Sequence, residues 1–160
     1  MMRDFHVRLA RPSDREALAR LLAALWPEST AEEHARELEL ILAGNAPGML
    51  PLVIFVSEDA DGSLVAFLEC GLRSHAESCN PSRPVGYVEG WYVAEGHRRK
   101  GVGKSLLKAA EDWAQSQGCT EMASDAVIDN KLSQRVHQRL GFQVVERSVL
   151  FRKPLRDVGG

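Results

Sequence analysis

Residues 90–105 read GWYVAEGHRRKGVGKS, the most informative stretch of the sequence. It runs from an apolar strand through a basic turn with glycines into the start of a helix. Backbone N–H groups at a helix N-terminus lack partners within the helix and carry the positive end of its dipole, so they bind phosphate groups. Gly101 and Gly103 let the backbone approach an anion without an intervening Cβ atom. The stretch predicts a phosphate-binding turn; the alternative is a solvated basic helix start with ordinary turn glycines.

Two common nucleotide-binding motifs do not fit this turn. Its end, Gly103-Lys104-Ser105, is that of a P-loop, but G-x-x-x-x-G-K-[ST] requires glycine where Arg98 stands. The dinucleotide motif G-x-G-x-x-G fails as well, because Leu106 takes the place of its third glycine. Neither motif therefore identifies the phosphate ligand.

Outward from the turn, hydrophobic spacing predicts alternating strands and helices. Helices are expected after the capping pairs Ser13–Glu16 and Thr30–Glu33, and again over 102–113 and 130–140, the last with Leu132, Val136 and Leu140 inward. Strands are expected at 5–9, 52–56, 64–68, 87–93, 121–126 and 142–151, with a loop at 73–85. The order βααβββαβαβ indicates an α/β fold, in which a mixed central sheet is flanked by helices on both faces.

Length and composition agree with one globular domain over residues 1–160. The chain has 44% hydrophobic and 26% charged residues, enough to bury a core. With 20 Lys+Arg against 22 Asp+Glu its net charge is -2, which argues against a nucleic-acid or anionic-membrane binder. No stretch approaches 18 apolar residues, and no signal-like segment opens the sequence. The three cysteines (Cys70, Cys79 and Cys119) lack metal-binding spacing, so we expect no metal site and a reducing, cytoplasmic location.

Two motifs resemble those of the GNAT superfamily of acyl-CoA-dependent N-acetyltransferases. Arg98-x-x-Gly101-x-Gly103 resembles the superfamily's pyrophosphate loop, [QR]-x-x-G-x-[GA]. Residues 130–142 are similar to its second motif, N-x-x-A-x-x-x-Y-x-x-x-G-F. The order of elements also matches that fold, so the resemblance covers residues 5–155. It implies a single GNAT domain that uses acetyl-CoA.

Within the superfamily, the chain resembles the aminoglycoside 6′-N-acetyltransferases. Four segments carry this resemblance: Leu25–Pro27, Val88–Val93, Glu121–Asp125 and Ser133–Gln138. Such enzymes inactivate aminoglycoside antibiotics by acetylating one primary amine, and they are typically cytoplasmic homodimers. A homodimer would also cover the apolar strand expected near the C-terminus, if that strand lies at the sheet edge.

The resemblance assigns roles to a set of residues. The backbone of Trp91, Tyr92 and Val93 would pair with the pantetheine arm of acetyl-CoA like an added strand. The turn (Arg98, Arg99, Lys100, Gly101, Val102, Gly103 and Lys104) would hold the pyrophosphate, and Asn130 would contact the cofactor further along. An aminoglycoside is a polycation, so its site needs acidic groups. Trp26 would supply an apolar wall, beside the carboxylates of Glu89, Asp125 and Glu146.

Several roles stay open at this point. Asp125 or Glu89 would accept the ammonium proton, or would bind and orient the amine by charge alone. Both are expected in or at the end of apolar strands, where unpaired carboxylates are costly, and this favours a functional role. His137 stands where relatives carry a tyrosine; it would protonate the leaving thiolate or pack as an ordinary helical histidine. The alternatives for the whole protein are a GNAT enzyme for another amine (a polyamine, a protein N-terminus or a lysine) and a non-catalytic acyl-CoA-binding regulator.

Overall fold

The computed structural model describes residues 4–45 and 50–156. The chain divides into two compact parts, residues 1–125 and residues 126–160. The first part contains a five-stranded sheet in the order β1-β2-β3-β4-β5, made of β1 (Phe5–Leu9), β2 (Leu52–Asp59), β3 (Leu64–Arg73), β4 (Val85–Val93) and β5 (Met122–Ser124). Strands β1 to β4 pair antiparallel and β5 pairs parallel with β4, so the predicted mixed sheet is confirmed.

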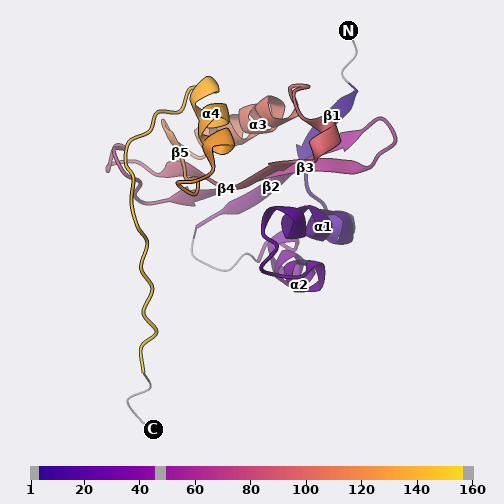
Figure 1. Cartoon of the computed structure of the whole chain (residues 1–160), viewed down its shortest axis with the longest axis horizontal. Coiled ribbons are helices and arrows are strands. Elements are labelled where there is room, and N and C mark those ends of the chain that lie inside the picture. The colour runs from indigo at the N-terminus through magenta and orange to yellow at the C-terminus, as the bar shows by residue number, and fades with distance from the viewer. Residues whose placement is uncertain (1–3, 46–49, 157–160) are drawn as a thin grey trace. The chain divides into compact units, whose positions relative to one another are not determined.

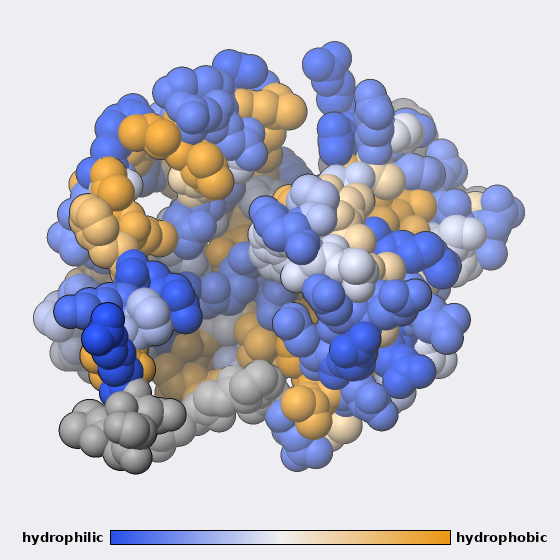
Figure 2. Space-filling view, turned by 60° about the horizontal axis from the view of Figure 1, so that its bottom comes forward, coloured by the Kyte–Doolittle hydropathy of each residue, from blue (hydrophilic) through white to orange (hydrophobic). Residues whose placement is uncertain are grey.

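Helices cover both faces of this sheet, as predicted. Helices α1 (Arg15–Leu25) and α2 (Ala31–Leu42) lie on one face, and α3 (Val102–Ser116) lies on the other (Figure 1). The apolar stripe of α1 packs against β2 and β3 in a core that includes Leu18, Leu22, Val56 and Phe67. Figure 2 shows that hydrophilic residues cover much of the surface on the side from which it is viewed.

The two helix starts differ in how well the sequence predicted them. Thr30 and Glu33 form the expected reciprocal capping box at α2. The prediction of Ser13 as the cap of α1 is wrong, because a 3₁₀ turn (Pro12–Asp14, η1) precedes the helix and Asp14 becomes its N-cap residue. The carboxylate of Asp14 accepts the backbone N–H of Arg11 at 2.7 Å.

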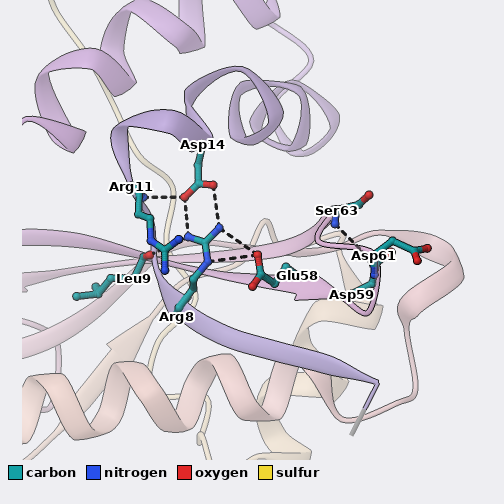
Figure 3. Close-up of polar contacts among 8 residues, drawn as sticks. All are labelled: Arg8, Leu9, Arg11, Asp14, Glu58, Asp59, Asp61 and Ser63. Atoms are coloured by element: carbon teal, nitrogen blue, oxygen red, sulfur yellow. Dashed lines mark hydrogen bonds and ion pairs between the residues drawn. The ribbon is translucent and has the colours of Figure 1, made fainter.

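An ion cluster joins β1, β2 and the start of α1 (Figure 3). Arg8 donates to both carboxylate oxygens of Asp14, at 2.7 and 2.9 Å, and to Glu58 at 3.2 and 3.4 Å. The side chains of Arg8 and Asp14 are 12% and 9% exposed, so solvent screens this pair weakly. The hydrogen bond from Arg8, more than any other contact, lowers the pKa of Asp14 below its ordinary value.

The second part contains α4 (Lys131–Arg139), which Asn130 caps by accepting the backbone N–H of Ser133. The inward placement of Leu132 is wrong, since 56% of this residue is exposed. The predicted strand at 142–151 is also wrong: residues 142–156 have no regular secondary structure. A strand needs a neighbouring backbone to complete its hydrogen bonds, and the described residues provide none.

This C-terminal segment exposes large hydrophobic side chains. Leu150 and Phe151 are 92% and 93% exposed, and Val149 is 76% exposed. Exposed hydrophobic residues appear in orange in Figure 2. Among the helices that the structure describes, none is long and apolar enough to cross a membrane.

Candidate active site

The predicted phosphate-binding turn has the expected geometry. After β4, a 3₁₀ turn (Glu95–His97, η2) leads to Gly101, which lies before the first residue of α3. Gly101 has a φ of 83°, a left-handed conformation that favours glycine. The first turn of α3 begins directly after it, so the N–H groups of residues 102–104 have no partner within the helix. N–H groups in this arrangement can bind an anion.

The basic side chains of the turn have different contacts. Arg98 donates from Nε to the carbonyl of Val93 at 2.8 Å, and its guanidinium lies 5.7 Å from the ring centre of Tyr92. Arg98 therefore braces the turn against the end of β4. Lys100 and Lys104 line a hollow of about 640 Å³ that also reaches β1. Two lysines beside the helix start add positive charge to the anion site.

The edge of β4 is left open next to this turn. Strand β5 pairs with β4 only at residues 86–88, so no strand of the described chain pairs with that edge over residues 89–93. Backbone groups on an open edge can pair with an extended ligand. This edge includes Trp91, Tyr92 and Val93, the residues expected to pair with a pantetheine arm.

A β-bulge in β4 changes which residues share a face of the sheet. Glu69 of β3 pairs with Gly90, whereas the next residue, Cys70, pairs with Val88, so Glu89 is the extra residue. Beyond the bulge, Trp91 lies on the face of α3, where it is near Gly103. Tyr87, Glu89, Gly90 and Tyr92 consequently share the opposite face, which α1 and α2 cover. No pattern in the sequence indicated this bulge.

Trp26 lies over β4 on this second face. A Cβ atom at Gly90 would overlap Cη2 of Trp26 and would lie 2.9 Å from its Cζ2 atom, so the indole rests directly on the glycine. The ring centres of Phe67 and His34 each lie 6.3 Å from that of Trp26. His34 also holds the end of α1, because its Nε2 lies 3.2 Å from the carbonyl of Trp26. Trp26 thus forms a fixed apolar wall.

Glu89 and Asp125 both accept hydrogen bonds from side chains of the protein. Arg73 donates to both oxygens of Glu89, at 3.0 and 2.9 Å, and stacks on Tyr87 with 3.4 Å between Cζ and the ring centre. The Tyr87 hydroxyl donates to Asp125 at 2.6 Å. Burial, followed by this bond to Asp125, raises the pKa of Tyr87 to about 12. Glu89 and Asp125 are thereby joined through Arg73 and Tyr87, neither of which was predicted as a site residue from the sequence.

Sequence reasoning also missed Glu69. It is the one charged residue in the apolar run LVAFLECGL at 64–72, which was the available signal. Its pairing with Gly90 places it on the same face as Trp26 and Glu89.

The remaining predicted residues belong to the second part and are described there alone. Asn130 caps α4, as given above. The His137 ring packs edge-on against Phe142 with 5.1 Å between ring centres, and its Nδ1 lies 2.7 Å from the Ser133 carbonyl. These contacts favour the packed helical histidine. Glu146 is exposed.

Within residues 4–45 and 50–156, no group of three or more His, Cys, Asp or Glu side chains could hold a metal ion.

Comparison with known proteins identifies the class. The model of the acetyltransferase (GNAT) family matches residues 15–142, so the chain belongs to the GNAT family. Aminoglycoside N(6′)-acetyltransferase type 1 of Klebsiella aerogenes is 39% identical over 149 residues, which are 93% of this chain and 96% of that protein.

Solved structures of one aminoglycoside acetyltransferase, AAC(6′)-Iy, are also similar to this chain. Its complex with the bisubstrate analogue CoA-S-monomethyl-acetylneamine has a TM-score of 0.83 at 34% identity and covers 94% of this chain and 99% of that one. Its complex with CoA has a TM-score of 0.84 at 34% identity and covers 94% and 95%. The predicted fold and family resemblance are confirmed.

Proposed function

We propose that this protein is an aminoglycoside 6′-N-acetyltransferase, which transfers the acetyl group of acetyl-CoA to the 6′-amine of the antibiotic and so gives resistance. The observation that carries this proposal is the joint presence of two features. One is an anion-binding turn beside an open strand edge, and the other is an acidic face of the sheet next to the indole of Trp26. The similarity to the Klebsiella aerogenes enzyme over 93% of the chain supports the same reading.

The cofactor side is assigned to residues 91–104, with Asn130 as a further contact. The N–H groups at the start of α3 hold the pyrophosphate, with Arg99, Lys100 and Lys104 adding positive charge. The open edge of β4 pairs with the pantetheine arm, and a backbone N–H there faces the thioester oxygen, which increases in negative charge during attack. Asn130 contacts the cofactor further along.

The substrate side is assigned to Trp26, Glu89 and Asp125, with Glu146 as a further acidic contact. The indole packs against a sugar ring while the carboxylates bind ammonium groups of the polycation. Since Arg73 and Tyr87 already donate to Glu89 and Asp125, these carboxylates are held in position before the substrate arrives. In the ternary complex, the amine attacks the thioester directly.

A panel of amines tests this function. The protein is incubated with acetyl-CoA, a thiol indicator and, in turn, kanamycin, a polyamine and a lysine-containing peptide. We expect thiol release with kanamycin and an acetyl group on its 6′-nitrogen, which NMR of the product would locate. Release with the polyamine or the peptide alone would indicate a GNAT enzyme for another amine. If no amine caused release, the protein would be an acyl-CoA-binding regulator.

We also propose that the enzyme is a cytoplasmic homodimer. The exposed apolar segment 142–156 supports dimerisation, because side chains such as Leu150 and Phe151 need cover from water. Its three cysteines are free thiols, which fits a reducing compartment.

A further inference from the structure

Glu69 is a carboxylate on the substrate face, the face of the sheet that carries Glu89, Gly90 and the Trp26 indole. The proposed function gives Glu69 no role. It pairs with Gly90 across the β3–β4 ladder, and directly opposite residues of an antiparallel pair project to the same face. Because the Trp26 indole rests on Gly90, Glu69 lies beside the wall assigned to the substrate. The bulge at Glu89 places a second carboxylate next to it on the neighbouring strand.

Glu69 differs from the other two carboxylates of this face in its partners. Glu89 accepts hydrogen bonds from Arg73, and Asp125 accepts one from Tyr87. Within residues 4–45 and 50–156, no donor or cation pairs with Glu69. Its oxygens are therefore available to a group that the protein itself does not supply.

The surroundings of Glu69 favour its protonated form. The acidic groups facing it are Glu89 from β4 and Glu37 from α2, while Arg73, four residues along β3, is bound to Glu89. Burial, followed by the charges of Glu89 and Glu37, raises the pKa of Glu69 to about 7. A proton acceptor works best when its pKa lies near the operating pH.

We propose that Glu69 is the proton acceptor of acetyl transfer, taking a proton from the 6′-ammonium group of the bound aminoglycoside. The neutral amine then attacks the thioester carbon and forms the C–N bond. The C–S bond breaks with its electron pair on sulfur, and a second proton from the nitrogen goes to the thiolate, which leaves the amide and CoA. Glu69 finally releases its proton to water. This inference rests on the proposed function and assigns the task that the sequence left open between Asp125 and Glu89.

Steady-state kinetics with kanamycin at saturating acetyl-CoA test the role. In Glu69→Gln we expect kcat at pH 8 to fall about 100-fold, within the range for loss of a general base, with KM changed less than about threefold. The wild-type kcat/KM should decline below about pH 7, and this decline should disappear in the variant. Glu69→Asp should keep part of the activity. Glu39→Gln removes an exposed carboxylate of α2 that pairs with Arg15, and it should behave as wild type.

Thermal unfolding separates catalysis from a structural role. Because the folded-state pKa of Glu69 lies above the ordinary 4.5, the folded protein holds this proton more tightly than the unfolded chain. Its ionisation therefore costs stability as pH rises from about 4.5 to 7. We expect Glu69→Gln to have a higher Tm than wild type at pH 8, with the gain shrinking toward pH 4. A structural role requires a lower Tm.

These measurements distinguish a failure of the proposed acetyltransferase function from a failure of the proton-acceptor role of Glu69. A wild-type protein that acetylates no aminoglycoside would refute the proposed function. If the wild type is active, then unchanged kcat in Glu69→Gln, or a raised KM at unchanged kcat, overturns the proton-acceptor role alone. A Glu69→Gln chain that does not fold overturns it as well, because the proposal requires stabilisation.

Discussion

At the scale of single residues, the carboxylates of the candidate site are fixed in different ways. Asp125 follows β5, at the carboxyl end of the strand, and is held by the Tyr87 hydroxyl at 2.6 Å. Sites in open α/β sheets collect at such strand ends. Tyr87, which orients the Asp125 carboxylate, therefore carries no positive charge that would compete with a substrate ammonium group.

We predict that Asp125→Asn lowers kcat/KM for an aminoglycoside by roughly 10- to 150-fold, the equivalent of one charged hydrogen bond of about 1.5–3 kcal/mol. The amide keeps the shape and removes the charge that pairs with an ammonium group. Kinetics with kanamycin and tobramycin measure the effect, and calorimetry should show unchanged acetyl-CoA affinity. Wild-type kcat/KM in this variant would remove Asp125 from the site.

A second residue-scale prediction concerns the ion cluster of Arg8, Asp14 and Glu58. Asp14→Asn should lower the free energy of unfolding at pH 7 by about 3 kcal/mol, because it leaves a nearly buried guanidinium with a weaker partner. The pKa of Asp14 is lowered in the folded state, so its contribution is present above about pH 4 and is lost as pH falls further. Wild type and variant should converge in acid.

Urea unfolding from pH 7 down to pH 3 measures this difference. Asp112→Asn is the matched control, since its pair with Lys108 is highly exposed and should contribute nothing measurable. Equal stabilities of wild type and Asp14→Asn at pH 7 would contradict the prediction.

At the scale of elements, the turn between β4 and α3 is the part that the sequence predicted best. Its glycines and basic residues are local signals, and the φ of 83° at Gly101 agrees with them. Gly103 differs from Gly101, because a Cβ atom there would make ordinary contacts at 3.5 Å with the Trp91 ring, so the position accepts a methyl group.

We predict that Gly103→Asp abolishes measurable acetyl-CoA binding while the chain stays folded. The substitution places a negative charge in the first turn of α3, where the pyrophosphate is expected. Gly103→Ala is the control and should bind nearly as wild type does. Titration calorimetry with acetyl-CoA compares the three proteins, and unchanged affinity in a folded Gly103→Asp would show that the phosphate site lies elsewhere.

Elements that depend on distant partners were predicted less well. The hairpin of β2 and β3 and the capping box of α2 arise from neighbours in sequence, and both are confirmed. The start of α1 was misplaced because Asp14 is engaged by Arg8 across the fold, which outweighs the local Ser13–Glu16 spacing. Likewise, the partners of Glu89 and Asp125 come from other strands or other positions of the ladder. The register between two strands leaves no short-range pattern in the sequence, whereas the residues of a turn do.

At the scale of the whole molecule, the C-terminal segment is the feature that a single chain does not explain. Its apolar residues predicted a strand, yet residues 142–156 form none, and Leu150, Phe151 and Leu155 are at least 90% exposed. A pattern of strand residues needs another backbone, which a second copy of the chain would supply.

We predict that sedimentation at micromolar concentration gives twice the chain mass of 17.7 kDa. Replacing both exposed apolar residues, as in Leu150→Asp with Phe151→Asp, should shift the protein to the mass of one chain, since charges disfavour a buried apolar contact. Arg152→Asp is a control for charge in the same segment. A wild-type protein with the mass of one chain would exclude the dimer.

The bulge in β4 also has a consequence for the length of the chain. Side chains alternate along a strand with period two, so one extra residue inverts the phase of everything beyond it. Removing the extra residue, Glu89, would make the pairs Cys70–Val88 and Glu69–Gly90 consecutive. Trp91 and Tyr92 would keep their faces, and the face that carries Gly90 and Tyr92 would lose the Glu89 carboxylate. We expect sequences that keep this site to accept insertions and deletions in the loop at 74–84 and in the hairpin turn at 60–63, and to keep β4 constant in length.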